Sequence, residues 1–228
     1  KIIYPTCSLI KITKKKEAEN ENRYKSLENN YLKRKFKHRI FTEEKWAKKK
    51  IRQFIKYAKI NKFNDKVELI NHHLAHAYSA YSFSPFNNSL VVTFDGKGDF
   101  KSSTVNKVEN NKWTELDYKT TFDSLGYFYG NVTQVLGFKP ERHEGKTTGL
   151  AAYGKKTAAI RYFESFIKNK KNDFSIKFCK DYMPYFSTRN QLPNFYRKLS
   201  KFSKKDISYA AQYILEKTIL NYIKKYIK

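Results

Sequence analysis

Apolar residues along this chain fall into short runs typical of strands and wider stripes typical of amphipathic helices. Leu90–Phe94 is apolar enough to predict a central, buried strand. Further strands are predicted at Val67–Ile70, Ser102–Val108, Trp113–Thr121 and Ser175–Cys179, with a strand end at Ile2–Tyr4. Helices are predicted at about Glu43–Lys59, His72–Phe83, Ser124–Leu136, Thr147–Tyr153 and Lys156–Ile167, and from Ser203 onward. The fold class is therefore α/β.

A turn, a helix start and an irregular region define most of the predicted topology. The Asn110–Asn111 pair marks a turn, so residues 90–121 are expected to form a three-stranded antiparallel meander with flanking helices. Ser203 and Asp206 form a capping-box pattern ahead of an apolar stripe, which we expect to pack against a sheet rather than on a membrane surface. Residues 180–200 are predicted to be irregular because two prolines interrupt them.

Composition narrows the class of protein. The 228 residues are 40% hydrophobic, which is enough for a packed core, and no apolar run approaches the length of a membrane span. The net charge of +26 suggests nucleic acid as a possible partner. The excess of positive residues is mostly lysine, however, in a chain that is also rich in Asn, Ile, Tyr and Phe. Biased codon usage explains that mixture better, so nucleic acid is not the partner we expect.

The ends of the chain and its cysteines add two expectations. Cys7 and Cys179 form no paired motif, which is typical of a reduced, cytoplasmic protein. The chain begins Lys1-Ile2-Ile3 without an initiator Met or a signal peptide, so we expect a piece of a longer protein.

Two histidines at helical spacing are the first candidate for chemistry. His72 and His76 lie on one face of the predicted helix, so both rings can approach one ion. A zinc-protease helix requires Glu after the first His, where this chain has His73. A lone histidine is most often a hydrogen-bonded core residue, whereas this pair favours a metal site that still needs a carboxylate.

Two glycine-containing segments are the other candidates. Asp95-Gly96-Lys97-Gly98-Asp99 is predicted to be a turn between strands, where backbone N–H groups and Lys97 could contact phosphate and the acids hydrated Mg²⁺. An ordinary hairpin has similar composition. The segment from Arg142 to Gly149 gathers cations, a carboxylate and hydroxyls at a helix start, which suits an anionic ligand. A solvated polar loop is an equal alternative for it.

These segments together resemble one family. INHHLAHAYSAYSFSPF (70–86), VVTFDGKGD (91–99), SLGYFYGNVTQVLGF (124–138) and KPERHEGKTTGLAAYG (139–154) resemble the carbamoyltransferases of the nodulation and antibiotic-tailoring type, such as the tobramycin and cephamycin carbamoyltransferases. The resemblance is dense over about 70–154 and weaker in the terminal helix. It divides the chain into a poorly matched basic segment, 1–60, and a partial family domain, 61–228.

The resemblance implies a fold and a reaction. The fold would be an actin–hexokinase-like (ribonuclease H-like) ATPase domain, related to the tRNA threonylcarbamoyl-transferring enzymes. Such enzymes make carbamoyl-adenylate from carbamoyl phosphate and ATP in a YrdC-like domain. The actin-like domain then transfers the carbamoyl group to a hydroxyl of a small-molecule or glycan acceptor.

The resemblance also implies roles for individual residues. His72 and His76 would bind a divalent metal, with iron expected, that holds the nucleotide or adenylate. Asp95–Asp99 would be a phosphate loop for ATP/Mg, with Asp95, Gly96, Lys97, Gly98 and Asp99 all contributing. Arg142, Glu144 and Lys146 would line the adenylate pocket. His143 is the candidate base for the acceptor hydroxyl, and Lys146 is grouped with it as catalytic.

Several parts of the family pattern are absent from the sequence. The first strands, the adenosine loop and the YrdC-like domain are expected in the missing remainder of the enzyme. The carboxylate that completes the metal site is expected beyond residue 228. The isolated chain is therefore expected to be weakly active or inactive. A non-catalytic fragment acting as a basic binding module is the alternative. A tRNA threonylcarbamoyl-type transferase is another, disfavoured by HHLAHA and RHEGK.

Overall fold

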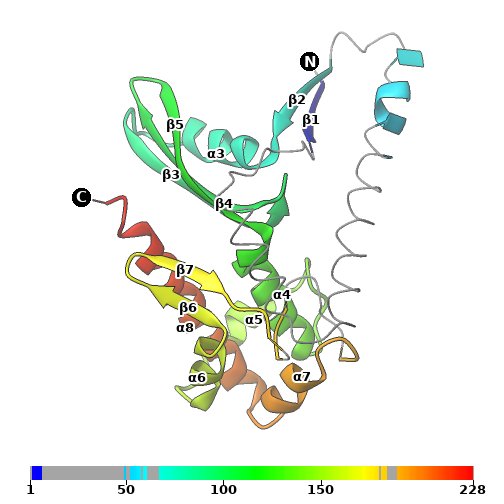
Figure 1. The fold of residues 1–228 in the computed structure, drawn as a ribbon, viewed down its shortest axis with the longest axis vertical. Coiled ribbons are helices and arrows are strands. Elements are labelled where there is room, and N and C mark those ends of the chain that lie inside the picture. The colour runs from blue at the N-terminus through cyan, green and yellow to red at the C-terminus, as the bar shows by residue number, and fades with distance from the viewer. Residues whose placement is uncertain are drawn as a thin grey trace. The chain divides into compact units, whose positions relative to one another are not determined.

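The computed structural model describes residues 2–6, 49, 52–57, 59–60, 67–179, 181–183 and 189–227 (Figure 1). The chain forms two compact units, which are described separately. The first contains Lys1–Thr93 and Lys97–Thr120, and the second contains Phe94–Gly96 and Thr121–Lys228. Of the helix predicted at Glu43–Lys59, residues 49, 52–57 and 59 are described and helical. Its other residues, like most of segment 1–60, lie outside the described ranges.

The first unit begins with a short parallel pair of strands. β1 (Ile2–Thr6) pairs with β2 (Val67–Asn71), so that Ile2 lies opposite Val67. Helix α3 (His72–Ser82) follows β2 without a loop, as predicted. The side chain of Asn71 caps the helix by accepting the N–H of Leu74 at 3.0 Å. This direct strand-to-helix junction fixes where the first histidine of the cluster lies.

The predicted meander is confirmed. β3 (Ser89–Gly98), β4 (Lys101–Glu109) and β5 (Lys112–Thr120) form a sheet in the order β3-β4-β5. The two turns have positive φ at both central residues, 52° and 63° at Asp99 and Phe100 and 48° and 62° at Asn110 and Asn111. Positive φ at both positions is the geometry of a two-residue hairpin, and Asn and Asp tolerate it well.

The placement of the first hairpin corrects a prediction. Asp95–Asp99 was expected to be the turn, but β3 continues to Gly98 and only Asp99 belongs to the turn. Backbone hydrogen bonding within the sheet outweighs the low strand preference of Gly96 and Gly98. The segment is therefore the end of a strand rather than a glycine-rich loop.

The second unit is mostly helical around an aromatic core. Its elements are η2 (Thr121–Asp123), α4 (Leu125–Val135), α5 (Glu144–Ala151), α6 (Ala158–Glu164), β6 (Ile167–Lys170), β7 (Asp173–Ile176), α7 (Pro193–Leu199) and α8 (Lys204–Ile223). Five aromatic rings from different parts of this unit are fully buried and contact one another: Phe128, Phe163, Phe166, Tyr182 and Phe195. These contacts hold α4 and α6 in one layer.

Four predictions for this unit need correction. α5 begins at Glu144 instead of Thr147, and α6 ends at Glu164, because Ile167 starts the antiparallel hairpin of β6 and β7. The predicted strand Ser175–Cys179 corresponds to β7, which ends at Ile176. The region 180–200 contains α7, with Pro193 in its first turn, where proline is well tolerated.

The last helix follows its predicted capping, and it packs against a sheet, as predicted, over only part of its buried face. Ser203 accepts the N–H of Asp206 at 3.1 Å and caps α8 as expected. The buried face of α8, which includes Ile207, Ala210 and Ile214, packs mainly against α5 and α6, and also against α4 and strand β7. Small alanines on this face allow close helix approach, which explains why helices cover most of it.

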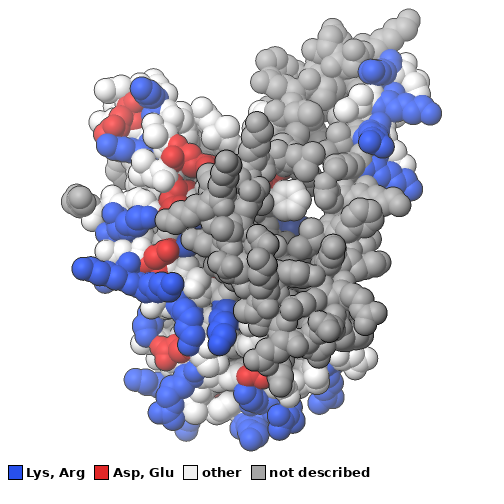
Figure 2. Space-filling view, in the orientation of Figure 1, with Lys and Arg blue, Asp and Glu red and all other residues white. Residues whose placement is uncertain are grey.

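The described surface carries the positive charge of the sequence. On the face seen in Figure 2, Lys and Arg cover more of the described surface than Asp and Glu. Within the described ranges, no helix is both long enough and apolar enough to cross a bilayer.

Candidate metal centre

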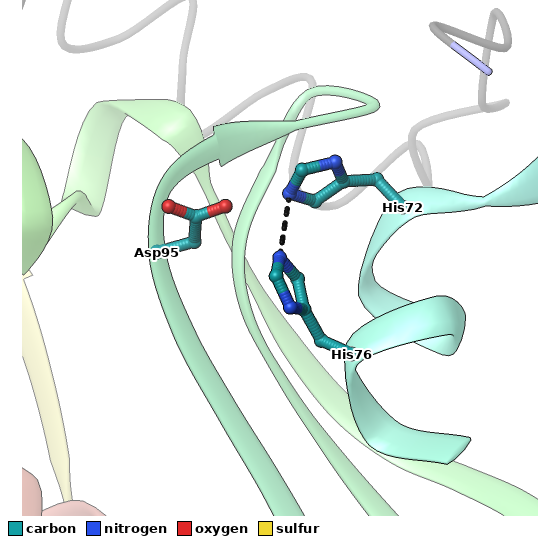
Figure 3. Close-up of side chains that lie close together, drawn as sticks. All are labelled: His72, His76 and Asp95. Atoms are coloured by element: carbon teal, nitrogen blue, oxygen red, sulfur yellow. Dashed lines mark hydrogen bonds between the residues drawn. The ribbon is translucent and has the colours of Figure 1, made fainter. Parts of the chain in front are cut away.

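His72 and His76 point to the same side of α3, as their spacing predicts (Figure 3). Their Nε2 atoms lie 3.1 Å apart, and the ring planes are inclined at 77°. His72 is half-buried and His76 is exposed, so the pair is accessible from solvent. The distance suits a hydrogen bond between the rings, in which one of the two nitrogens carries the proton.

Asp95 on β3 faces the histidine pair (Figure 3). Ligand atoms of His72, His76 and Asp95 all lie within 4.8 Å of one another. Asp95 is placed by its own strand, because Thr93 and Gly98 on either side of it both contact α3. The described residues therefore include one carboxylate at the pair. The further carboxylate expected beyond residue 228 stays a prediction.

The donor set fits a divalent transition metal. Two histidine nitrogens bound to one ion at about 2.0–2.2 Å are themselves separated by about 3 Å, close to the 3.1 Å between the two Nε2 atoms. Two imidazoles and one carboxylate suit Fe²⁺, Mn²⁺ or Zn²⁺ and leave further positions open, whereas Mg²⁺ prefers oxygen ligands. The two imidazoles already have the separation of ligands to one ion, and the Asp95 carboxylate would have to move closer to them to join the set.

His73 belongs to the sheet side of α3. It is fully buried, and its Nδ1 lies 2.8 Å from Thr93 Oγ1. Thr93 Oγ1 in turn lies 2.8 Å from Thr104 Oγ1 on β4. His73 therefore contributes to the packing of α3 and not to the ligand set formed by the other two histidines.

The remaining residues of the Asp95–Asp99 segment have distinct surroundings. Asp95 Oδ1 accepts the N–H of Gly96 at 2.6 Å, and Ser124 Oγ donates to the Asp95 carbonyl at 3.2 Å. Lys97 is exposed, whereas Gly98 and Asp99 are buried against α3. Only Lys97 therefore presents its side chain to solvent as a phosphate contact would require.

The Arg142–Lys146 segment lies in the second unit, at the start of α5. Arg142 and Lys146 are exposed, which leaves two cations accessible to an anion. Glu144 Oε1 accepts the N–H of Glu141 at 2.6 Å, and His143 Nδ1 accepts the N–H of Lys139 at 3.2 Å. Glu144 and His143 therefore each use one side-chain atom to shape the turn that precedes the helix.

Hydroxyl pairs anchor α5 beneath these residues. Thr147 Oγ1 lies 2.8 Å from Thr133 Oγ1 in the core, and Tyr129 Oη lies 2.9 Å from Thr148 Oγ1. Tyr129 also donates to Gln212 Oε1 on α8 at 2.8 Å. Burial raises the pKa of Tyr129 above its ordinary value, so its hydroxyl remains a donor at neutral pH. The start of α5 is thus bonded to α4 directly and to α8 through Tyr129.

Strand alternation in the sequence could have placed Asp95 beside the histidines, although the neighbouring glycines suggested a turn. Val91, Thr93 and Asp95 alternate along β3, so they share one face of the strand. Val91 packs with Ala77, and Thr93 contacts His73, so this is the face that α3 covers. Asp95 follows Val91 and Thr93 on this face, so the alternation directs it toward the helix that carries the histidines.

Comparison with known proteins identifies the family. The family model described as "Carbamoyltransferase N-terminus" matches residues 10–228, so this chain belongs to the carbamoyltransferase family through that N-terminal region. The match covers both structural units and includes the histidine helix, the meander and α4–α8. The resemblance inferred from the four motifs is confirmed.

Individual relatives match over shorter stretches. Nodulation protein NolNO of Sinorhizobium fredii is 38% identical over 104 residues, 44% of this chain and 15% of that protein. Nodulation protein NolO of Bradyrhizobium diazoefficiens is 39% identical over 85 residues, 37% of this chain and 15% of that protein. An uncharacterized protein of Methanocaldococcus jannaschii is 40% identical over 109 residues, 41% of this chain and 18% of that protein. The matched region spans less than a fifth of these relatives.

Proposed function

We propose that this chain is the acceptor-carbamoylating part of an ATP-dependent carbamoyltransferase, and that its α3–β3 cluster holds a divalent metal ion. The cluster of His72, His76 and Asp95, with ligand atoms within 4.8 Å, is the observation that carries the proposal. Family membership supports the transferase class. The donor and acceptor, carbamoyl-adenylate and a hydroxyl of a glycan or small molecule, follow from the resemblance. An actin-like ATPase architecture is part of the same proposal.

The proposed transfer is an acyl substitution. The acceptor oxygen bonds to the carbamoyl carbon, the bond from that carbon to the adenylate phosphate oxygen breaks, and the hydroxyl proton leaves to a base. A bound divalent ion would offset negative charge on the departing phosphate oxygen. His72, His76 and Asp95 would hold that ion, and iron is the candidate that the resemblance favours over manganese and zinc.

Charged residues at the start of α5 have a separate proposed role. The exposed cations of Arg142 and Lys146 suit the phosphate of an adenylate. Glu144, which shapes the preceding turn through the Glu141 N–H, would orient this segment. Lys97, exposed at the end of β3, is a further candidate contact for ATP/Mg.

His143 can act as the base through Nε2 only if that nitrogen is unprotonated. Its Nδ1 accepts the Lys139 N–H, so the neutral ring carries its proton on Nε2. A ring in that form donates from Nε2 and does not accept a proton there. His143 is therefore better suited to donate a hydrogen bond to phosphate or carbamoyl oxygen, and the adenylate phosphate itself is an alternative base.

Cobalt titration tests the metal centre directly. Co²⁺ bound through imidazole gives visible absorption, so binding to the purified chain can be measured without a reaction. His72→Ala, His76→Ala and Asp95→Asn should each weaken binding at least about tenfold. Glu109→Gln is the matched control, because it removes an exposed charge from the same sheet. Equal affinity in all four variants and the unaltered chain would exclude this cluster as the binding site.

A second assay tests the reaction class. The chain with ATP, carbamoyl phosphate and a hydroxyl-rich oligosaccharide should be assayed for transfer of ¹⁴C-carbamoyl label, alone and with the remaining part of a family enzyme. Label on the oligosaccharide that depends on His72 and His76 supports the proposal. Transfer that survives loss of both histidines would separate the metal centre from the reaction.

A further inference from the structure

Asp99 contacts the backbone of the first metal-binding candidate. The N–H of His72 donates to Asp99 Oδ2 at 2.8 Å, and Asp99 is only 3% exposed. This N–H lies in the first turn of α3, where backbone donors have no partner within the helix. Asn71 accepts the N–H of Leu74 in the same turn. Asp99 thus supplies the second side-chain cap of α3, from a hairpin 27 residues further along the chain.

Gly98 contacts the ring of the same histidine. A Cβ atom at position 98 would lie 2.0 Å from His72 Cδ2 and 2.2 Å from His72 Cγ. The backbone of Gly98 does not require glycine, because positive φ in this hairpin falls on Asp99 and Phe100. The absence of a side chain is instead required by the imidazole, which rests directly on the strand.

We propose that Gly98 and Asp99 are positioning residues for the metal centre. Gly98 leaves the space that the His72 ring occupies, and Asp99 fixes the backbone from which that ring projects. Together they direct His72 Nε2 toward His76 Nε2, 3.1 Å away. Asp95, Gly98 and Asp99 then serve one centre: the first offers a ligand atom and the other two hold a ligand in place. The inference rests on the proposed function for the identity of the site as a metal centre.

This assignment differs from a phosphate-binding role for the same two residues. A phosphate contact needs exposed N–H groups or cations, whereas Gly98 and Asp99 are both buried against α3. The Asp99 carboxylate already accepts the His72 N–H, and a second anion beside it would be repelled. Only Lys97 of the segment retains the exposure that a phosphate contact needs.

Metal affinity and histidine geometry test the proposal together. Asp99→Ala should weaken Co²⁺ binding about 10–100-fold, as loss of an outer-shell partner commonly does. Asp99→Asn keeps a side-chain oxygen that accepts the His72 N–H, so its affinity should stay within about threefold of the unaltered chain. Gly98→Ala should weaken binding at least as much as Asp99→Ala. Glu109→Gln again controls for the loss of a surface charge.

A readout in the metal-free chain separates positioning from general stability. Amide exchange at His72 should accelerate in Asp99→Ala and recover in Asp99→Asn, while exchange in β4 and β5 stays unchanged. ¹⁵N spectra of the imidazoles should show an altered His72 ring in Gly98→Ala. If Gly98→Ala does not fold, the pair of Asp99 variants still decides the question.

The outcomes separate this inference from the proposed function. Equal Co²⁺ affinity in Asp99→Ala and the unaltered chain, with affinity lost in His76→Ala, overturns the positioning role and leaves the metal centre standing. If the unaltered chain binds no Co²⁺, the metal centre fails, and the His72 measurements alone decide the positioning role. Unchanged His72 exchange in Asp99→Ala then overturns it.

Discussion

His73 Nδ1 lies 2.8 Å from Thr93 Oγ1, and this contact joins α3 to the middle of β3. Thr93 Oγ1 also accepts the N–H of Thr104 at 3.1 Å, so the hydroxyl links the helix to two strands. His73 and Ala77 are the fully buried residues of α3. One of the two buried anchors of this helix is therefore polar. With this face of α3 on the sheet, His72 and His76 lie near Asp95.

Replacing Thr93 by valine should destabilise the chain by about 1–3 kcal/mol, because the valine lacks the hydroxyl that the buried His73 nitrogen contacts. Urea unfolding monitored by the Trp113 signal measures this, since Trp113 packs against the same cluster as Ala77. Thr114→Val, at an exposed position of β5, is the matched control and should change stability by less than about 0.5 kcal/mol. Equal effects in both variants would contradict the anchoring role of Thr93.

Local patterns sufficed to predict the part of the chain around the metal centre. Helical spacing correctly placed His72 and His76 on one face, and strand alternation gave the meander. The turn at Asp99–Phe100 was missed because glycines usually mark turns, and here they lie within a strand. The need for glycine at position 98 comes from a ring 26 positions earlier in the chain, which no local window includes.

Tertiary contacts explain what was missed in the second unit. Ile167, the first residue of β6, is predicted as the end of a helix because it continues the apolar spacing of α6. Ile167 instead adopts strand geometry because it pairs with β7, where it lies opposite Ile176. α7 is only seven residues long and owes its order to the buried rings of Phe195 and Tyr182. Short helices depend on such packing more than on propensity.

Two glycines near α5 should respond in opposite ways to substitution by alanine. A Cβ at Gly154 would lie 2.1 Å from the Lys205 carbonyl oxygen, so Gly154→Ala must displace backbone and should destabilise by about 1–3 kcal/mol. Gly149, inside α5, has no atom within 4 Å of its Cβ position. Gly149→Ala should stabilise by roughly 0.5–1 kcal/mol through helix propensity. Thermal unfolding of both variants checks this, and a stabilising Gly154→Ala would contradict the close approach.

The contact between Asp206 and Lys155 should make stability depend on acid pH. The Lys155 N–H, followed by Ser203, holds the pKa of Asp206 below its usual value of 3.8. A lowered folded pKa stabilises the chain above pH 3.8, and that contribution disappears as the pH falls through the lowered pKa. The stability difference between the unaltered chain and Asp206→Asn should therefore be constant near neutral pH and shrink below about pH 4. Urea unfolding at pH 7, 5 and 3 measures it, and a difference that grows in acid would contradict the assignment.

The hydrogen bond from Lys139 to His143 predicts which ring nitrogen carries the proton. Because Nδ1 accepts the Lys139 N–H at 3.2 Å, the neutral ring should be protonated on Nε2. Long-range ¹H–¹⁵N spectra at about pH 8.5 report the tautomer directly. His143→Asn can retain an acceptor for the Lys139 N–H, whereas His143→Ala cannot, so only His143→Ala should speed exchange of the Lys139 amide. A ring protonated on Nδ1 would remove the reason to prefer a donor role, and His143 would again be the leading candidate for the base that takes the acceptor proton.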